Sequence, residues 1–386
     1  MESSKPISSF KPGTFVQDYN YKYFLPEKIN REWILDSPEI QSLCNEANRN
    51  LGELNAFSQL IPDVDFFIRM HITKEATTSS RIEGTRTKME EAFLKEEDVS
   101  PEKRDDWQEV QNYIDAMNFA IGELEKLPVS SRLIRKTHKI LMHGVRGKYR
   151  QPGAYRKSQN WIGGASLKDA VFVPPHYKYV PELMSDLEYF FHNEQIYVPE
   201  LVRIAIGHYQ FETIHPFLDG NGRIGRLLIA LYLVSRKILL KPSLYLSDFF
   251  ERNKTLYYEN LMKVRESEDM EQWLKFFMVG AIETAQNSIQ TFKDIIALRE
   301  EIEHTIVLKM GKRAPKARKL VEELYKNPVI NVKQVEHMLN VSKPTANSLI
   351  RELMEKNVLQ ELTGMKRNRV FIFYRYIHLF SSKEIQ

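Results

Sequence analysis

Apolar residues recur every three or four positions along most of the chain, which is the spacing of helices that bury one face. The pattern covers residues 37–127, with an interruption at Pro62 and a separate helix over 105–124. It returns after Ser131 and is expected to continue, with breaks, over 182–310. The spacing therefore predicts a mainly α-helical fold.

Three segments depart from this spacing. Residues 1–30 are rich in proline, tyrosine and phenylalanine, and we expect them to form an extended arm over the surface. Residues 149–181 combine a Gly-Gly pair, the β-prone run Ala170–Val173 and a double proline, which favour a short hairpin or an irregular loop. Residues 331–362 predict a helix, a turn and a second helix capped by Ser342, followed by strand-like runs.

The length of 386 residues suits two or three domains. We expect an N-terminal arm and helical region over 1–128 and a helical core over 129–284. A linker helix is expected over 285–310, followed by a C-terminal domain over 311–386.

The composition is that of an ordinary globular protein, with 42% hydrophobic and 27% charged residues. No run approaches the roughly 18 apolar residues that span a bilayer, and the first 13 residues lack the apolar stretch of a secretion signal. Cys44 is the only cysteine, which excludes an internal disulfide framework and a cysteine-based zinc site. We therefore expect a cytoplasmic protein with no membrane partner.

Positive charge gathers at the C-terminal end of the chain. Residues 311–386 contain 15 Lys and Arg against 7 Asp and Glu, whereas the residues before them contain 40 against 44. This distribution favours contact with a polyanion, and it is equally typical of a solvated basic surface.

The stretch His215–Leu228, HPFLDGNGRIGRLL, places three glycines and two arginines between two apolar helical stripes. Glycine costs about 1 kcal/mol in a helix interior, so its repetition here indicates a requirement of the backbone. Gly220 and Gly222 are expected to adopt positive φ angles and to let a ligand approach the main chain. The next helix begins at this loop, and its free N–H groups form an anion site.

The side chains of this loop suit a phosphate ligand. Arg223 and Arg226, about one helical turn apart, offer forked donors to phosphate oxygens. Asn221 supplies an amide donor, and Asp219 is suited to Mg²⁺ that bridges two phosphates. His215 can take up a proton near neutral pH. Each residue alone has an ordinary structural explanation, but the set predicts a nucleotide site.

HPFLDGNGRIGR resembles the signature of the Fic family, His-Pro-Phe-x-(Asp/Glu)-Gly-Asn-Gly-Arg-x-x-Arg, at every specified position. The similarity extends through GAYRKSQNWIGG, AVFVPP, VPELMSDLEYF and YLSDFFERNKTLYYENLMKVRE, over roughly residues 131–281. Weaker similarity reaches into the N-terminal helices. The resemblance implies an all-helical enzyme that transfers AMP from ATP to a Tyr, Thr or Ser hydroxyl of a target protein.

The resemblance also implies the roles of the loop residues. His215 would be the general base on the target hydroxyl, and Asp219 would bind Mg²⁺ at the α and β phosphates. Asn221 and the backbone around Gly220 and Gly222 would stabilise the transferred phosphate, and the β and γ phosphates would be held by Arg223 and Arg226.

Two further contacts are implied by the same resemblance. The segment LKDAVFVPP, residues 167–175, would be a flap that pairs with the target as an added strand. Its contact residues would be Lys168, Asp169, Ala170, Val171 and Phe172. Tyr257 or Tyr258 would approach the adenine.

The sequence SSRIEG, residues 79–84, fits the inhibitory motif of the family, (Ser/Thr)-x-x-x-Glu-(Gly/Asn). Its position resembles the subgroup whose inhibitory helix precedes the core in the same chain, and the motif would begin at Ser79. Glu83 would form a bidentate pair with Arg226 and occupy the place of the γ phosphate. In some family members the corresponding glutamate is linked to AMP removal, so the reverse reaction stays open.

The C-terminal domain resembles a winged helix-turn-helix. The DNA-binding hypothesis places Lys343, Thr345, Asn347 and Arg351 on the recognition helix and Lys366, Arg367 and Arg369 on the wing. Winged helices also serve in dimerisation and protein docking, so this alternative remains open.

Three functions compete on the sequence. The first is an ATP- and Mg²⁺-dependent protein adenylyltransferase, which could also modify itself and could form homodimers. The second is a DNA-binding transcriptional regulator whose Fic core only senses nucleotide. The third keeps the fold but removes AMP or transfers another phosphate-containing group.

Overall fold

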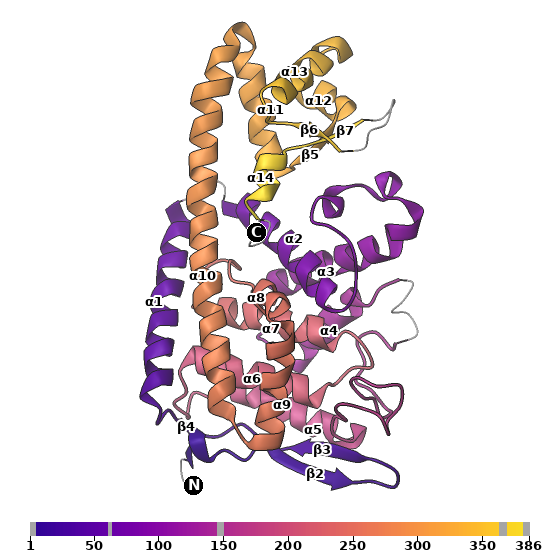
Figure 1. The fold of residues 1–386 in the computed structure, drawn as a ribbon, viewed down its shortest axis with the longest axis vertical. Helices are drawn as coiled ribbons and strands as arrows, with labels where there is room; N and C mark the ends of the chain where they lie inside the picture. The colour runs from indigo at the N-terminus through magenta and orange to yellow at the C-terminus, as the bar shows by residue number, and fades with distance from the viewer. Residues whose placement is uncertain (1–4, 61–63, 145–149, 363–368, 381–386) are drawn as a thin grey trace.

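The computed structural model describes residues 5–60, 64–144, 150–362 and 369–380, and it is mainly α-helical, as the apolar spacing predicts (Figure 1). The α-helices are α1 (Pro38–Leu60), α2 (Val64–Ile82), α3 (Arg104–Glu123), α4 (Ser131–Leu141), α5 (Val180–His192), α6 (Glu200–Ile214), α7 (Asn221–Ser235), α8 (Ser247–Arg252), α9 (Lys254–Ser267), α10 (Met270–Glu301), α11 (Ala314–Lys326), α12 (Val332–Leu339), α13 (Lys343–Glu355) and α14 (Tyr374–His378). The strands are β1 (Lys5–Pro6), β2 (Gly13–Gln17), β3 (Lys22–Pro26), β4 (Trp33–Ile34), β5 (Val329–Asn331), β6 (Gln360–Glu361) and β7 (Val370–Ile372).

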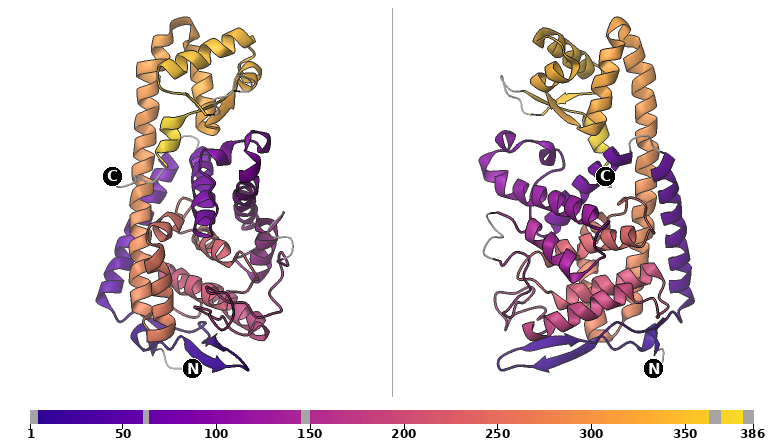
Figure 2. Two further views of the ribbon diagram at one scale, coloured as in Figure 1. Left: turned by 45° about the vertical axis from the view of Figure 1, so that its right-hand side comes forward. Right: turned by 180° about the vertical axis from the view of Figure 1, so that it is seen from behind.

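Helices α6 and α7 form the centre of the core. Every residue of α6 from Leu201 to Ile214 is buried, and α7 is buried from Ile224 to Leu233. The two helices pack against each other, and Figures 1 and 2 show them surrounded by the other helices. A helix buried on all sides must also satisfy its polar side chains internally. The loop that joins α6 to α7 is therefore anchored at both ends by buried helices.

Helix α10 is the long axis of the molecule, and α1 packs along it (Figure 1). Asp269 caps its start, since its Oδ1 accepts a hydrogen bond from the Gln272 N–H at 3.0 Å. The expected boundary between core and linker at residue 285 falls inside this one continuous helix. The helical path ends at Gly311, whose φ of 55° lets the chain turn into α11.

The N-terminal segment differs from the extended arm that its composition suggests. Strands β2 and β3 form an antiparallel hairpin, and β1 pairs in parallel with β4. The Phe24 N–H of β3 donates to the Val173 carbonyl at 2.9 Å, which joins the hairpin to the segment 167–175. Phe24 is fully buried, and its ring centroid lies 6.1 Å from that of Phe172. The arm is ordered because it covers this part of the core.

The segment expected as a short hairpin contains a single β-bridge, between Ile162 and Phe172. The Ile162 N–H donates to the Phe172 carbonyl at 2.8 Å, and the Phe172 N–H donates back at 3.1 Å. The rest of residues 149–181 forms turns around this bridge. Both expectations for this segment, hairpin and irregular loop, thus describe part of it.

The C-terminal elements follow the predicted helix, turn and helix. Strands β5, β7 and β6 form a three-stranded antiparallel sheet in that order, beside α12 and α13. A capping box between Asn331 and Gln334 starts α12. Ser342 occupies the predicted cap position of α13, but its hydroxyl lies 3.0 Å from the Thr345 hydroxyl instead of bonding a backbone N–H.

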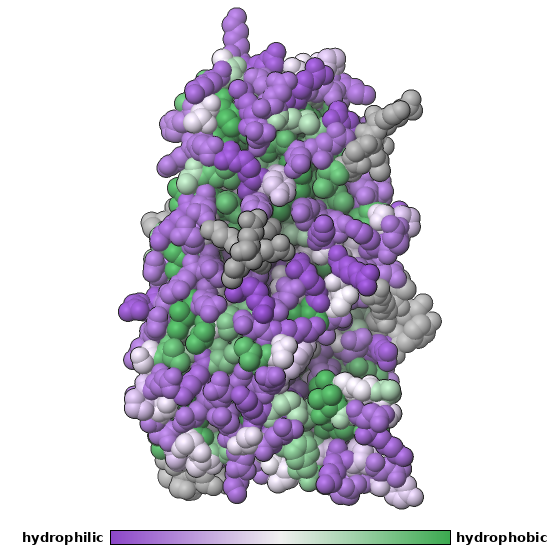
Figure 3. Space-filling view, viewed as in Figure 1, coloured by the Kyte–Doolittle hydropathy of each residue, from purple (hydrophilic) through white to green (hydrophobic). Residues whose placement is uncertain are grey.

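The end of the described chain packs against helix α2. The Phe380 ring lies 5.8 Å from that of Phe67 and 5.2 Å from that of His71. Figures 1 and 2 show the C-terminal elements at the top of the molecule, reached through α10. Figure 3 shows a largely hydrophilic face with scattered hydrophobic patches. In the part of the chain that the structure describes, every helix is too short or too polar to span a bilayer.

Candidate functional site

The loop between α6 and α7 is built on two residues in the left-handed region. His215 ends α6 with a φ of 49°, and Gly220 precedes α7 with a φ of 78°. The value at Gly220 agrees with the sequence prediction, whereas Gly222 lies within α7 and is not among the positive-φ glycines of the described chain. A left-handed histidine is strained, and such residues persist only where their surroundings hold them.

Asn221 stabilises the loop. Its Oδ1 accepts a hydrogen bond from the Phe217 N–H at 2.8 Å, and its Nδ2 donates to the Phe217 carbonyl at 2.9 Å. The side chain is buried. Its amide group is therefore committed to Phe217 in this structure and not turned outward as the expected phosphate donor.

His138 of α4 contacts the loop, although no sequence pattern identified it as a site residue. Its ring stacks on Phe217, with centroids 3.7 Å apart and planes 5° apart. The Gly153 N–H donates to His138 Nδ1 at 2.8 Å, so the ring proton sits on Nε2, which lies 2.9 Å from the Asp219 carbonyl. Burial lowers the pKa of His138 to about 4, which keeps this tautomer neutral.

Arg226 is held by the end of helix α2. Its Nη2 donates to Glu83 Oε1 at 2.7 Å and to the Ser79 carbonyl at 2.9 Å, and its Nε donates to Ser79 Oγ at 2.8 Å. The sequence predicted this pairing but with two Glu83 contacts, whereas Ser79 provides the others. Burial raises the pKa of the Glu83 carboxyl, but the nearby Arg226 guanidinium outweighs burial and holds this pKa below its ordinary value.

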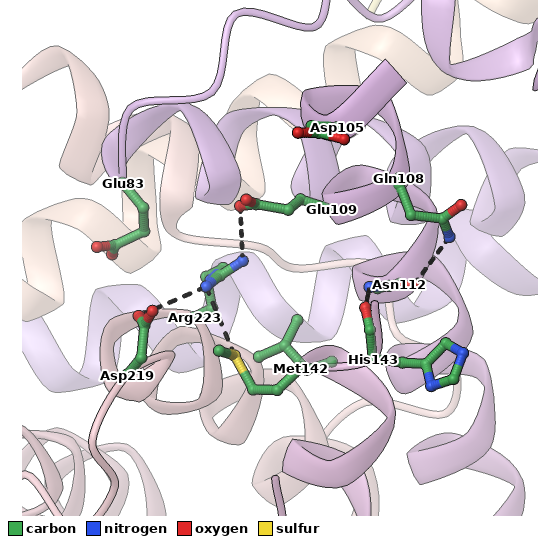
Figure 4. Close-up of a pocket in the computed structure, with 10 residues that line it drawn as sticks. Glu83, Asp105, Gln108, Glu109, Asn112, Met142, His143, Asp219 and Arg223 are labelled. Atoms are coloured by element: carbon green, nitrogen blue, oxygen red, sulfur yellow. Dashed lines mark hydrogen bonds and ion pairs between the residues drawn. The ribbon is translucent and has the colours of Figure 1, made fainter. Parts of the chain in front are cut away.

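Arg223 is also paired with a carboxylate of the N-terminal region. Its Nη1 lies 3.1 Å from Glu109 Oε2 of α3, and its Nη2 lies 3.7 Å from Asp219 Oδ1 (Figure 4). The Nη2 atom also lies 3.7 Å from the sulfur of Met142. Glu109 carries no sequence motif, so only the packing of α3 on α7 brings it to this place.

These groups border a cavity of about 220 Å³. Glu83, Asp219 and Arg223 line one side, and residues of α3 line the other, as Figure 4 shows. The Asp219 side chain is 46% exposed, and its Oδ1 accepts a hydrogen bond from the Gly220 N–H at 2.6 Å. No cluster of three His, Cys, Asp or Glu side chains that could hold a metal occurs among the described residues.

The Asp219 carboxylate, which is partly exposed at the cavity, would fit Mg²⁺ held together with a phosphate ligand. Mg²⁺ is commonly bound by one or two carboxylates, with substrate phosphates and water as the remaining ligands. The carboxylate borders the cavity directly, and Arg223 Nη2 lies 3.7 Å from its Oδ1.

His215 is a neutral imidazole in this setting. Burial lowers its pKa to about 3, and the Arg156 guanidinium adds to this effect. Its Nδ1 is buried and has no hydrogen-bond partner among the described residues. A neutral ring is the form that can accept a proton.

Gly222 and Gly225 of α7 allow other groups to approach the main chain closely. A Cβ atom on Gly222 would lie 2.5 Å from Glu83 Oε1 and 3.0 Å from Arg226 Nη1. Gly222 therefore keeps open the place where a carboxylate meets Arg226. Gly225 faces the buried Glu212 carboxyl of α6, whose pKa burial raises to about 7.

Residues 41–122 match the family model described as Fic/DOC family N-terminal, and residues 128–233 match that described as Fic/DOC family. These two ranges of the chain are thus similar to Fic/DOC proteins. The matched range includes the loop, the flap and Glu83, and it ends before α8.

Relatives of this chain include proteins named as protein adenylyltransferases. A probable protein adenylyltransferase of Aquifex aeolicus is 29% identical over 191 residues, which cover 48% of this chain and 53% of that protein. The protein adenylyltransferase Fic of Drosophila grimshawi is 27% identical over 163 residues, which cover 42% of this chain and 30% of that protein. The chain thus spans about half the length of the first relative and less than a third of the second.

Two solved structures share the Fic fold with this chain. A Fic family protein from Desulfovibrio desulfuricans has a TM-score of 0.55 and 21% identity, and it covers 88% of this chain and 97% of its own. A Fic domain-containing signalling protein from Bacteroides thetaiotaomicron has a TM-score of 0.50 and 18% identity, with 66% and 97% covered. At these identities the likeness supports the fold alone.

The remaining predicted residues of the Fic core lie in different environments. Tyr257 is buried, and its hydroxyl lies 2.9 Å from His208 Nε2. Tyr258 is 40% exposed. In the flap, Phe172 is buried under the Arg265 guanidinium at 3.8 Å, whereas Val171 is 66% exposed.

The other three flap residues lie between these two environments. Lys168 and Asp169 are exposed, and Ala170 is half-buried. The Asp169 carboxylate accepts a hydrogen bond from the Ser166 hydroxyl at 2.7 Å.

The residues of the DNA-binding hypothesis are also dispersed. Lys343 and Arg351 of α13 are exposed, whereas Thr345 and Asn347 are half-buried. Arg369 forms an ion pair with Glu361 on the neighbouring strand. Lys366 and Arg367 lie outside the described residues.

Replacing Gly225 with alanine is expected to destabilise the protein by about 1–3 kcal/mol, because a Cβ would meet the buried Glu212 carboxyl well inside van der Waals contact. The added Cβ would also lie 3.2 Å from the Phe211 ring, so the strain has little room to relax. Gly52 of α1 is the matched control, since a Cβ there would meet nothing within 4 Å. Gly52→Ala should stabilise by up to about 1 kcal/mol. Thermal unfolding checks both, and equal effects would contradict this packing account.

Proposed function

We propose that this chain is a protein adenylyltransferase that transfers AMP from ATP to a Tyr, Thr or Ser hydroxyl of a protein and is held inactive by Glu83. The observation that carries this proposal is the position of the Glu83 carboxylate. It forms an ion pair with Arg226 at 2.7 Å and lines the same cavity as Arg223. An anionic phosphate chain in its place would meet the same two arginines.

In the proposed reaction, the neutral His215 ring accepts the proton of the target hydroxyl as the hydroxyl oxygen attacks the α phosphorus. The bond to diphosphate breaks, and AMP remains on the target. The N–H groups at the start of α7 and the two arginines stabilise the negative charge on the phosphates. When bound at Asp219, Mg²⁺ would neutralise phosphate charge.

In the same proposal, Glu83 inhibits by occupying Arg226. The Arg226 side chain is only 1% exposed and has three hydrogen bonds to Ser79 and Glu83, so a γ phosphate must displace Glu83 to reach it. Glu109 holds Arg223 in a comparable way. Release of the end of α2 would free Arg226. Removal of AMP from a modified protein is a variant of this proposal at the same site.

We further propose a winged-helix module for residues 311–386, supported by the order of helix, strand, two helices and two strands. The exposed Lys343 and Arg351 on α13 favour a nucleic-acid partner, and a nucleotide-sensing regulator of transcription is the second candidate function.

The metal proposal is tested by replacing Asp219 with asparagine in a Glu83→Gly background. We expect the Mg²⁺ concentration for half-maximal AMP transfer to rise at least about tenfold, because the carboxylate proposed to bind the metal is lost. Labelled AMP on protein is measured against Mg²⁺ concentration. Asp105→Asn, which changes another carboxylate lining the cavity, is the control and should leave the curve unchanged. Equal shifts in both variants would contradict the assignment.

A further inference from the structure

Arg156 connects three segments that meet at the catalytic loop. Its Nε donates to the His215 carbonyl at 3.0 Å, and its Nη2 donates to the Ile214 carbonyl at 3.3 Å. The same Nη2 donates to the Pro175 carbonyl at the end of the flap, and Nη1 donates to the Ser158 carbonyl at 3.3 Å. One guanidinium thus bonds the base, the end of α6 and the flap.

The neighbouring residues add bonds between the same segments. The Arg156 N–H donates to the Pro216 carbonyl at 2.9 Å. Gln159 donates from its side chain to the Pro174 carbonyl of the flap at 2.9 Å, and Asn160 donates to the Phe217 carbonyl of the loop at 3.0 Å. Residues 156–160 therefore form a bridge between the flap and the loop.

Arg156 is buried, with 2% of its surface exposed, yet it forms no ion pair within the described chain. A buried charge without a counter-ion is costly and is retained only where its hydrogen bonds are well satisfied. The planar fork of arginine reaches several carbonyls at once, which a lysine ammonium on a flexible stem does not. One of these carbonyls belongs to the strained, left-handed His215.

We propose that Arg156 is a positioning residue of the transfer reaction, which sets the base His215 relative to the flap and keeps a positive charge beside the imidazole. This inference rests on the proposed function, because it assigns Arg156 a part in presenting the target hydroxyl to His215. The hydrogen bonds of its guanidinium all go to backbone carbonyls, those of Ser158, Pro175, Ile214 and His215. Arg156 should therefore act on the rate of transfer and not on ATP binding.

The charged groups that face His215 come from three directions. Arg156 precedes the flap, Arg265 lies on α9, and Glu83 lies at the end of α2. The backbone of Glu212 in α6 also interacts with the ring. Once Glu83 is removed, the two arginines remain. Loss of the Arg156 charge would then favour the imidazolium and raise the pKa of His215, which moves the acid limb of the rate profile to higher pH.

The test compares Arg156→Gln and Arg156→Lys in a Glu83→Gly background, using ATP labelled at the α phosphate and the proteins of a cell lysate as acceptors. Arg203→Gln is the matched control, because Arg203 is also buried and donates to the carbonyls of Phe190, Asn193 and Ile196, away from the loop. Melting temperature and apparent KM for ATP are measured for each variant, and rates are expressed per folded molecule.

We expect Arg156→Gln to lower the rate about 100-fold, the size of effect expected when a reacting group is misplaced by about 1 Å, with KM for ATP within about twofold. Its acid limb should move to higher pH. Arg156→Lys should keep the acid limb, since it keeps the charge, but lose at least about tenfold in rate. Arg203→Gln should lower the melting temperature alone.

Two results would overturn the assignment. One is a rate and pH profile in Arg156→Gln that match those of Arg203→Gln. The other is loss of folding in both Arg156 variants while Arg203→Gln folds, which would give Arg156 a purely structural role. Absence of labelling in Glu83→Gly itself would instead contradict the proposed function.

Discussion

Glu83→Gly is expected to raise the rate of AMP transfer at least about tenfold over the wild type. The Arg226 side chain is only 1% exposed, so its ion pair with Glu83 is shielded from water and contributes to inhibition. The Glu83 side chain is 36% exposed, so it can leave Arg226 without disrupting the core. One hydrogen bond between charged groups contributes about 1.5–3 kcal/mol, and solvent screening favours the lower end of that range. About 1.4 kcal/mol corresponds to a tenfold change in equilibrium.

The variant Glu83→Gln separates charge from bulk. It keeps the size of the side chain in the space that Gly222 leaves open, but it cannot form an ion pair with Arg226. We expect a rate between those of the wild type and Glu83→Gly. Labelled AMP on protein is measured at a fixed, saturating ATP concentration. A rate in Glu83→Gly no higher than in the wild type would contradict inhibition by this residue.

His215→Ala in the Glu83→Gly background is expected to lower the rate by about 10²–10⁴-fold, the usual contribution of a positioned general base. The reason is that the His215 ring is the neutral group beside the loop and is free to accept a proton through its nitrogen atoms. The dissociation constant for ATP, measured by calorimetry, should change only a few-fold because the proposal assigns phosphate binding to the arginines and α7.

His304→Ala is the control for this variant, since His304 is exposed in the segment after α10 and should leave the rate unchanged. The competing hypothesis of a nucleotide-sensing regulator expects no functional loss from His215→Ala. Retained labelling in the double variant would therefore count against the base and in favour of that alternative.

The sequence predicted the parts of the site that lie close together in the chain. The loop motif placed His215, Asp219 and the two arginines near one another because they follow closely along the end of α6, the loop and the start of α7. It also predicted the Glu83–Arg226 pair across 143 residues, through the resemblance of a short upstream motif.

The sequence could not predict partners that only tertiary packing supplies. Glu109 reaches Arg223 across 114 residues, and His138 reaches the Asp219 carbonyl across 81 residues. Neither has a local pattern that distinguishes it from an ordinary helix residue. Arg156 lies in the stretch GAYRKSQNWIGG that is similar to the family, but the role proposed for it depends on carbonyls of the loop and the flap, which carry no side-chain signal.

In the fold, too, local patterns were predicted and features that depend on tertiary packing were not. Helix spacing predicted the helices because it reports which face is buried. The sequence did not predict the β2–β3 hairpin, because apolar and polar residues do not alternate cleanly along it. Strand β3 buries the consecutive residues Tyr23 and Phe24, and their rings lie near those of Tyr179 and Phe172, respectively. Strands whose two faces are both covered lose the period of two that identifies them.

The most direct test of the account compares wild type, Glu83→Gly and Glu83→Gly/His215→Ala, each incubated with Mg²⁺, ATP labelled at the α phosphate and a cell lysate. The account predicts strong protein labelling in the single variant, weak labelling in the wild type and none above background in the double variant. Label on the chain itself would identify self-modification as one outcome. Absence of label from all three samples would contradict AMP transfer as the chemistry of this site.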